Sequence, residues 1–203
     1  MKLNWFETLL MNNPVRAFVQ RRYEAPRLAK IAYRPFNDAT ALIIGCGRGV
    51  DVHIAFEMYQ VQSVTAIDID PAQVDRARKL LGDQYRDLLT LQVGDASAIP
   101  FADESFDLVL DFGVIHHVPD WRQAIREIHR VLSPGGQFVF EDIPGHKLYS
   151  WHYRTFTDYP RENRFELSDF RDECEAAGFV IGDHLESFFG FFRGAALKKA
   201  EAA

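Results

Sequence analysis

The sequence has few cysteines, no excess of basic residues and no long uncharged apolar run. Its 203 residues include two cysteines, Cys46 and Cys174, whose spacing matches neither a disulfide framework nor a metal motif. We therefore expect a reducing compartment and no bound metal. The N-terminus lacks a signal-peptide pattern and no run reaches membrane-spanning length, so we expect a cytoplasmic protein. The net charge of −6 argues against non-specific nucleic-acid binding, which needs a basic face.

The clearest local pattern is residues 41–49, Ala-Leu-Ile-Ile-Gly-Cys-Gly-Arg-Gly. The apolar run at 41–44 predicts a buried strand, and the helical spacing of apolar residues over 50–59 predicts a helix. The glycines between them let the backbone turn through positive φ and lie against a ligand. Strand, glycine turn and helix are typical of the first half of a nucleotide-binding unit.

A second pattern follows the glycines at the spacing that is typical of nucleotide-binding units. Residues 63–68 predict a strand that ends in Asp68, about twenty residues beyond the glycines. A carboxylate at this position can accept hydrogen bonds from both hydroxyls of an adenosine ribose. Pro71 then suits the first turn of a helix over 72–81, with Asp70 as its N-cap.

The remaining pattern predicts an α/β fold. Further strands are expected at 88–93, 106–110 and 137–141, with a helix from 116 to 132 and a turn at 133–136. A helix at 167–177 precedes two strands, 179–190 and 191–198, which must be antiparallel because they are separated by only a tight turn. We expect a doubly wound, Rossmann-like sheet of seven strands. The sheet should be mostly parallel with an antiparallel C-terminal strand, and helices should cover both faces.

We expect a single domain over residues 1–203. Residues 1–36 would form a helical cap, 37–142 the cofactor-binding core, 143–166 an aromatic lid, and 167–203 the C-terminal helix and strand pair. The alternative for residues 1–22 is peripheral membrane contact, with aromatic residues in the lipid and arginines at anionic headgroups. The lid aromatics Tyr149, Trp151 and Tyr153 suit an apolar or aromatic acceptor or a cationic amine, or else they pack on the core.

Four segments resemble the successive motifs of class I S-adenosylmethionine-dependent methyltransferases. They are Ile44-Gly-Cys-Gly-Arg-Gly49, Ala66-Ile-Asp-Ile-Asp70, Gly94-Asp-Ala-Ser-Ala-Ile-Pro-Phe101 and Arg130-Val-Leu-Ser-Pro-Gly-Gly136. The likeness covers residues 42–139 and, more loosely, the antiparallel end. It is nearest to the broad group of quinone-pathway and small-molecule methyltransferases.

The resemblance implies S-adenosylmethionine as the cofactor and a small or amphipathic molecule as the methyl acceptor. Asp68 would hold the ribose hydroxyls, Ile69 would pack on the adenine, and Asp95 would accept from the adenine amino group. The implied cofactor-binding residues are Gly45, Cys46, Gly47, Asp68, Ile69, Asp95, Ala96, Phe112 and Gly113.

One position departs from the family pattern. An acidic residue usually stands two places before the first glycine, and Ile43 occupies that place here. A partly buried charge-assisted hydrogen bond contributes roughly 1.5–3 kcal/mol, so cofactor binding would be weaker unless Asp111 or Asp51 compensates.

Methyl transfer depends mainly on alignment, and a base is needed only when the acceptor loses a proton. His116 and His117 are the candidate bases, with packing and helix capping as their alternative roles. Glu141 and Asp142 form the other polar cluster expected near the acceptor.

Three other functions compete with this one. The first is a dehydrogenase, and the sequence argues against it because the third glycine of the dinucleotide-binding motif is replaced by Val50. Ile43 favours a non-catalytic cofactor-binding or regulatory protein, and the N-terminal pattern favours a membrane-surface lipid methyltransferase.

Overall fold

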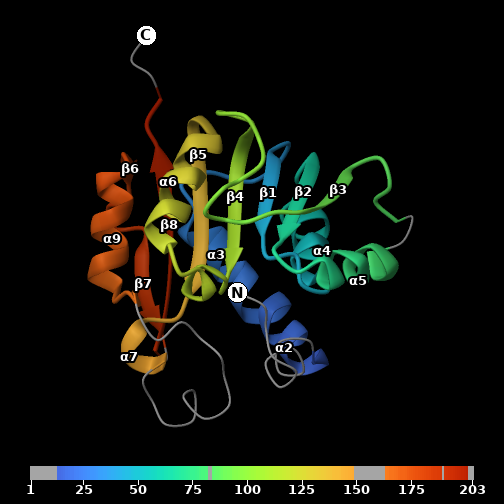
Figure 1. Cartoon of the computed structure of the whole chain (residues 1–203), viewed down its shortest axis with the longest axis horizontal. Coiled ribbons are helices and arrows are strands. Elements are labelled where there is room, and N and C mark those ends of the chain that lie inside the picture. Colours follow the sequence, from blue (N-terminus) through green and yellow to red (C-terminus); the bar gives the residue numbers. More distant parts are fainter. Residues whose placement is uncertain (1–12, 82–83, 149–162, 189, 201–203) are drawn as a thin grey trace.

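The computed structural model describes residues 13–81, 84–148, 163–188 and 190–200. They contain one mixed sheet in the order β3-β2-β1-β4-β5-β8-β6, with β7 also paired to β8 (Figure 1). The strands are β1 (Thr40–Ile44), β2 (Ser63–Asp68), β3 (Leu89–Val93), β4 (Phe106–Phe112), β5 (Leu132–Asp142), β6 (Phe179–Val180), β7 (Leu185–Phe188) and β8 (Phe191–Lys198).

The predicted fold class is confirmed, with one difference at the C-terminal end. Strands β1 to β5 are mutually parallel, and β8 runs antiparallel to β5. The expected strand over 179–190 is instead two short strands, β6 and β7, both antiparallel to β8. A turn separates them, because Gly182 has φ +55° and the His184 N–H donates to the Ile181 carbonyl.

Helices cover both faces of the sheet (Figure 1). Ala41 and Ile43 of β1 point to one apolar layer, and Leu42 and Ile44 point to the other, as the two-residue period of a strand requires. The first layer is shared with α3 (Ala25–Ile31), α4 (Val50–Glu57) and α5 (Pro71–Leu81), and the second with α6 (Trp121–Val131) and α9 (Leu167–Ala176).

The described N-terminal segment is one helical stretch. It comprises α2 (Pro14–Val19), the π-helical turn η1 (Gln20–Glu24) and α3. Asn13 caps α2 by accepting from the Arg16 N–H at 2.8 Å, so a helix begins at Pro14. The stretch lies beside the carboxyl ends of the central strands (Figure 1), and the Tyr59 hydroxyl anchors it by donating to the Ala25 carbonyl at 2.8 Å.

Two predicted features lie outside the described residues. They are the first twelve residues of the expected N-terminal cap and most of the aromatic lid, including Tyr149, Trp151 and Tyr153. The short helix α7 (Gly145–Leu148) is the described start of the lid region. No helix in the described ranges is both long enough and apolar enough to cross a bilayer.

Two boundaries near the C-terminal half of the core differ from prediction. Helix α6 begins at Trp121, capped by Asp120, and His116 lies before it on the 3-10 turn η2 (Ile115–His117). Strand β5 begins directly after α6, and the predicted turn at 133–136 is a bulge within that strand. Between two pairings with β4, β5 advances from Leu132 to Gln137 while β4 advances only two residues.

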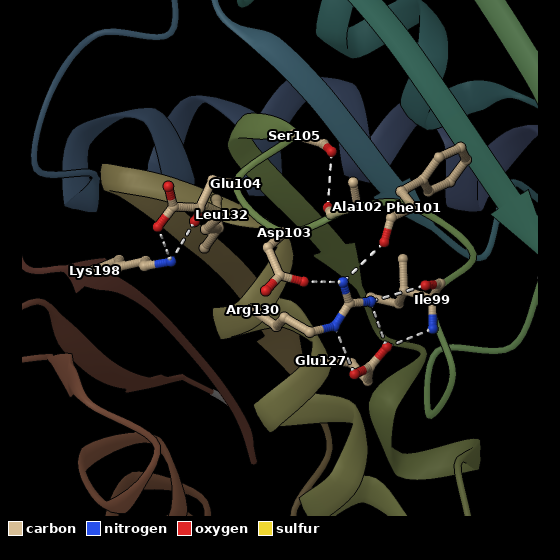
Figure 2. Close-up of polar contacts among 10 residues, drawn as sticks. All are labelled: Ile99, Phe101, Ala102, Asp103, Glu104, Ser105, Glu127, Arg130, Leu132 and Lys198. Atoms are coloured by element: carbon tan, nitrogen blue, oxygen red, sulfur yellow. Dashed lines mark hydrogen bonds and ion pairs between the residues drawn. The ribbon is translucent and has the colours of Figure 1, made fainter.

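A cluster around Arg130 braces the loop that follows β3. The Arg130 guanidinium donates to the carbonyls of Ile99 and Phe101 and to the carboxylates of Asp103 and Glu127, at 2.7–2.9 Å (Figure 2). The Glu127 carboxylate in turn accepts from the Ile99 N–H at 2.8 Å. A guanidinium suits this role because its five donors lie in one fixed plane. Arg130 therefore ties the loop after β3 to helix α6.

Candidate functional site

One pocket opens at the carboxyl ends of β1, β2 and β4. Its walls are the glycine loop after β1, the residues that end β2, the loop after β3, the residues that follow β4, and the N-terminal helical stretch. All nine residues expected to bind the cofactor border this pocket: Gly45, Cys46, Gly47, Asp68, Ile69, Asp95, Ala96, Phe112 and Gly113. The pocket lies where ligands bind in open α/β sheets.

The glycine loop is fixed to the end of β2. The N–H groups of Gly45 and Cys46 both donate to the Ile67 carbonyl, at 2.8 and 2.9 Å. Gly45 has φ +75°, and a Cβ there would lie 2.5 Å from Val114, so a larger residue would not fit. At Gly47 a Cβ would meet no atom within 4 Å, so this glycine faces open space in the pocket. A ligand can therefore approach the loop backbone closely.

Asp68 is held at the end of β2 by two backbone groups. Its Oδ2 accepts from the Gly47 N–H at 3.2 Å, and its Oδ1 accepts from the Asp70 N–H at 2.9 Å. Burial raises the pKa of Asp68 above its usual value, and these two hydrogen bonds offset only part of that rise. Since a carboxylate has about four acceptor positions, Asp68 can still accept hydroxyl donors from the pocket.

The loop after β3 provides the opposite wall. Asp95 Oδ1 accepts from both the N–H and the hydroxyl of Ser97, each at 2.8 Å. Ile69, across the pocket, is 41% exposed and offers an apolar surface. A flat ring with a donor at its edge would fit between an apolar side chain and a fixed carboxylate.

The two histidines occupy different positions. His117 borders the pocket, whereas His116 lies behind Gly113, where a Cβ would approach the His116 ring at 3.8 Å. Burial, and then the charge of His116, lowers the pKa of His117 well below the usual value. His117 is therefore neutral at pH 7, with a lone pair on one ring nitrogen.

The acidic pair after β5 is buried. Asp142 accepts from the His116 ring Nδ1 and, at 3.1 Å, from the His116 backbone N–H. The Glu141 carboxylate lies 3.2 Å from the Arg193 guanidinium. Neither acid borders the pocket, so each holds a neighbouring side chain instead. Within the part of the chain that the structure describes, no group of three or more His, Cys, Asp or Glu side chains is arranged to hold a metal.

Comparison with known proteins shows what this geometry is similar to. Residues 42–140 match the family model described as a methyltransferase domain. This core of the chain is therefore similar to a methyltransferase domain. A demethylmenaquinone methyltransferase of Desulfitobacterium hafniense (strain Y51) is 31% identical over 121 residues, which are 56% of this chain and 48% of that protein. A ubiquinone/menaquinone biosynthesis C-methyltransferase of Geotalea daltonii is 34% identical over 130 residues, which are 63% of this chain and 54% of that protein.

The solved structures agree on the fold. An S-adenosylmethionine-dependent methyltransferase from Aquifex aeolicus superposes with a TM-score of 0.76 at 17% identity, covering 97% of this chain and all of that one. The chain spans about half the length of the curated relatives it matches. The family implies S-adenosylmethionine as the cofactor. The open glycine loop and the oriented Asp68 fit an adenosine-containing ligand.

Sequence reasoning missed two residues that line the pocket. Arg16 and Gln20 border the pocket, although the sequence pattern places them in a cap or at a membrane surface. The Gln20 Nε2 donates to Asp51 Oδ1, and the Arg16 guanidinium pairs with Glu24. The four-residue spacing of Arg16, Gln20 and Glu24 is the signal in the sequence, because it puts all three on one helix face.

The position that departs from the family pattern carries no charge. Ile43 is fully buried in the apolar layer beneath α4. Of the two acids expected to compensate, Asp51 borders the pocket, while Asp111 is fully buried and accepts from the Val114 N–H at 2.8 Å.

Asp51 should make the stability of the protein depend on pH. Burial raises its pKa to about 7; Arg16 and Gln20 lower it and Glu24 raises it further. The folded protein therefore keeps a proton that the unfolded chain releases near 3.8, so the free energy of unfolding falls as pH rises from about 4 through 7. We expect Asp51→Asn to be more stable than the wild type at pH 8 by about 1–3 kcal/mol, and the difference to shrink toward pH 4.

Urea unfolding of both proteins at several pH values measures this difference. Comparing the two proteins cancels the contribution of Glu141, whose pKa burial also raises to about 7. A difference that stays constant with pH would show that Asp51 is not forced to take up a proton on folding.

Proposed function

We propose that this protein is an S-adenosylmethionine-dependent methyltransferase that acts on a small or amphipathic acceptor. The observation that carries this proposal is Asp68. Asp68 is fixed at the end of β2 by hydrogen bonds from the Gly47 and Asp70 N–H groups. Beside it the pocket is open, because a Cβ added at Gly47 would meet no atom within 4 Å. A carboxylate held in this arrangement would accept hydrogen bonds from both hydroxyls of a ribose.

When bound, the cofactor supplies an electrophilic methyl group on a sulfonium. The protein's part is to hold and orient the ligand. Asp68 would accept from the ribose hydroxyls, Asp95 would accept from the adenine amino group, and Ile69 would cover one face of the ring. The positions of the three side chains around one pocket support these roles. Alignment of this kind accounts for most of the rate in such a transfer.

Part of the pocket lining is apolar. Val114, Val118 and Pro119 follow Gly113 in the chain and line the pocket together with His117. The two relatives described above are named for quinone-pathway methylation. We therefore propose a hydroquinone or phenol as the acceptor, with its ring against the apolar residues.

His117 is the better candidate for the base. Methylation of a phenol oxygen, or of the neighbouring ring carbon, would form one bond to the methyl carbon while the methyl–sulfur bond breaks. The neutral thioether would leave with that electron pair, and the acceptor would release one proton. His117 borders the pocket and is neutral, so it can take that proton. His116 lies behind Gly113, and Asp142 fixes its ring. In this account His116 positions His117, since their ring centroids are 4.2 Å apart.

Cofactor binding should depend on Asp68. We expect calorimetric titration with S-adenosylhomocysteine to show micromolar binding by the wild type and at least tenfold weaker binding by Asp68→Ala, which loses charge-assisted hydrogen bonds. Asp75→Ala, an exposed acid on α5, is the matched control and should bind like the wild type. Equal binding by wild type and Asp68→Ala would contradict the assigned site.

Turnover should depend on His117 once an acceptor is supplied. With a demethylated menaquinol as acceptor, we expect His117→Asn to reduce kcat by about 100- to 10,000-fold. Its affinity for S-adenosylhomocysteine should stay within about threefold of the wild type. His129→Asn, a partly buried histidine on α6, controls for loss of an imidazole. An unchanged kcat in His117→Asn would show that His117 is not the base in the reaction.

A membrane-surface site of action is the second candidate. Val15, Phe18 and Tyr23 are 61–70% exposed on the N-terminal helical stretch, beside the pocket. Exposed apolar side chains on a helix favour an interfacial position. We expect the wild type to co-sediment with phosphatidylglycerol vesicles, and a Val15→Ser/Phe18→Ser variant to pellet several-fold less. Leu80→Ser, on α5, is the control. Equal pelleting of all three proteins would exclude this site of action.

A further inference from the structure

Two buried carboxyl groups hold the turn that carries the histidines. Asp111 lies next to last in β4, Asp142 ends β5, and both are fully buried. The Asp111 Oδ1 accepts from the Val114 N–H at 2.8 Å, and the Asp142 Oδ2 accepts from the His116 N–H at 3.1 Å. These two contacts fix the chain on either side of Ile115, where η2 begins.

The Asp142 carboxylate receives donors from three neighbouring residues. Its Oδ2 accepts from the His116 main chain, and its Oδ1 accepts from the His116 ring Nδ1 and, at 2.7 Å, from the Ile143 N–H. Asp111 is the remaining donor. Burial, and then the charge of Asp142, raises the pKa of Asp111 well above its usual value, so Asp111 keeps its proton and donates it to Asp142 in a hydrogen bond. Since a carboxylate has about four acceptor positions, Asp142 is fully paired as an anion.

The ionised Asp142 sets the tautomer of His116. An ionised carboxylate can only accept hydrogen bonds, so the His116 ring must carry a proton on Nδ1 to bond with it. The same carboxylate holds the His116 main chain, so one group fixes both the ring and the backbone of this residue. Since His116 is only 6% exposed, its ring has little room to rotate.

His116 in turn lies against the candidate base. The centroids of the His116 and His117 rings are 4.2 Å apart, and the ring planes are tilted by 36°. The His117 N–H also donates to the Val114 carbonyl at 2.9 Å, so the position of His117 depends on the turn that the two acids hold. His117 borders the pocket. The contacts therefore run from Asp142 through His116 to a side chain at the pocket.

The same contacts bear on the charge that methyl transfer would create. A base that takes a proton from the acceptor becomes a buried cation, which is costly without an anion nearby. Asp142 is such an anion, and the His116 ring is in contact with both Asp142 and His117. The neighbouring acid, Glu141, pairs with Arg193 instead.

We propose that Asp142 is a positioning residue for methyl transfer and that it acts on His117 through His116. Asp142 fixes the tautomer and the ring of His116, His116 holds the His117 ring at the pocket, and Asp111 completes the hydrogen bonding of Asp142. The assignment rests on the proposed function, with His117 as the base.

The variant Asp142→Asn distinguishes this role from simple capping of the turn. Asparagine keeps the size of the side chain and an oxygen that accepts main-chain N–H groups, but its amide would donate to the His116 Nδ1 and so reverse the tautomer. With a demethylated menaquinol as acceptor, we expect kcat to fall at least about 30-fold. The affinity for S-adenosylhomocysteine in calorimetric titration should stay within about threefold of the wild type.

Nitrogen-15 NMR of the imidazole groups reads the tautomer without cofactor or acceptor. The His116 proton should lie on Nδ1 in the wild type and on Nε2 in Asp142→Asn, and the signals lost in His116→Gln identify this ring. Glu141→Gln is the matched control, since Arg193 keeps Glu186 as a partner at 3.6 Å. It should retain the wild-type tautomer and a kcat within about threefold of the wild type.

The possible results separate this assignment from the proposed function. A wild-type His116 with its proton on Nε2, or an Asp142→Asn variant with the wild-type kcat, overturns the assignment. A fall in kcat with an equal fall in S-adenosylhomocysteine affinity overturns it too, because Asp142 would then serve only to hold the fold of the site. If the wild type binds no S-adenosylhomocysteine and transfers no methyl group, the proposed function fails, and the NMR measurement still decides whether Asp142 orients His116.

Discussion

The attachment of the glycine loop to the end of β2 is the contact on which the site depends. The Ile67 carbonyl accepts from both Gly45 and Cys46, and the next carboxylate along β2, Asp68, accepts from Gly47. These bonds set where the loop turns, and therefore where a ligand can lie between Asp68 and the residues after β4. The pocket is thus built largely from main-chain geometry, which explains why short glycine-rich motifs identify it.

Electrostatics in and near the pocket oppose stability as pH rises. Desolvation raises the pKa of Asp51, which borders the pocket, and that of Glu141, which does not, to about 7 each. Functional sites commonly keep such unfavourable groups because a ligand compensates them.

Local pattern predicted most of the core, because each β-strand and its following helix carry their own periodicity. Residues 63–68 match β2 as predicted, and all nine expected cofactor-binding residues border one pocket. Contacts between distant segments could not be predicted in this way. The spacing of Arg16 and Gln20 gives a helix face, but only packing against α4 shows that the face meets Asp51. Likewise, the partnership of His116 with Asp142 follows from the pairing of β4 with β5.

The most direct test of this account is a crystal structure of the protein with S-adenosylhomocysteine bound. We predict that the ribose hydroxyls will lie within hydrogen-bond distance of Asp68, with the adenine ring between Ile69 and Asp95. A ligand bound in the pocket with its ribose away from Asp68 would contradict the assigned role of Asp68. A ligand bound outside the pocket would contradict the site as a whole.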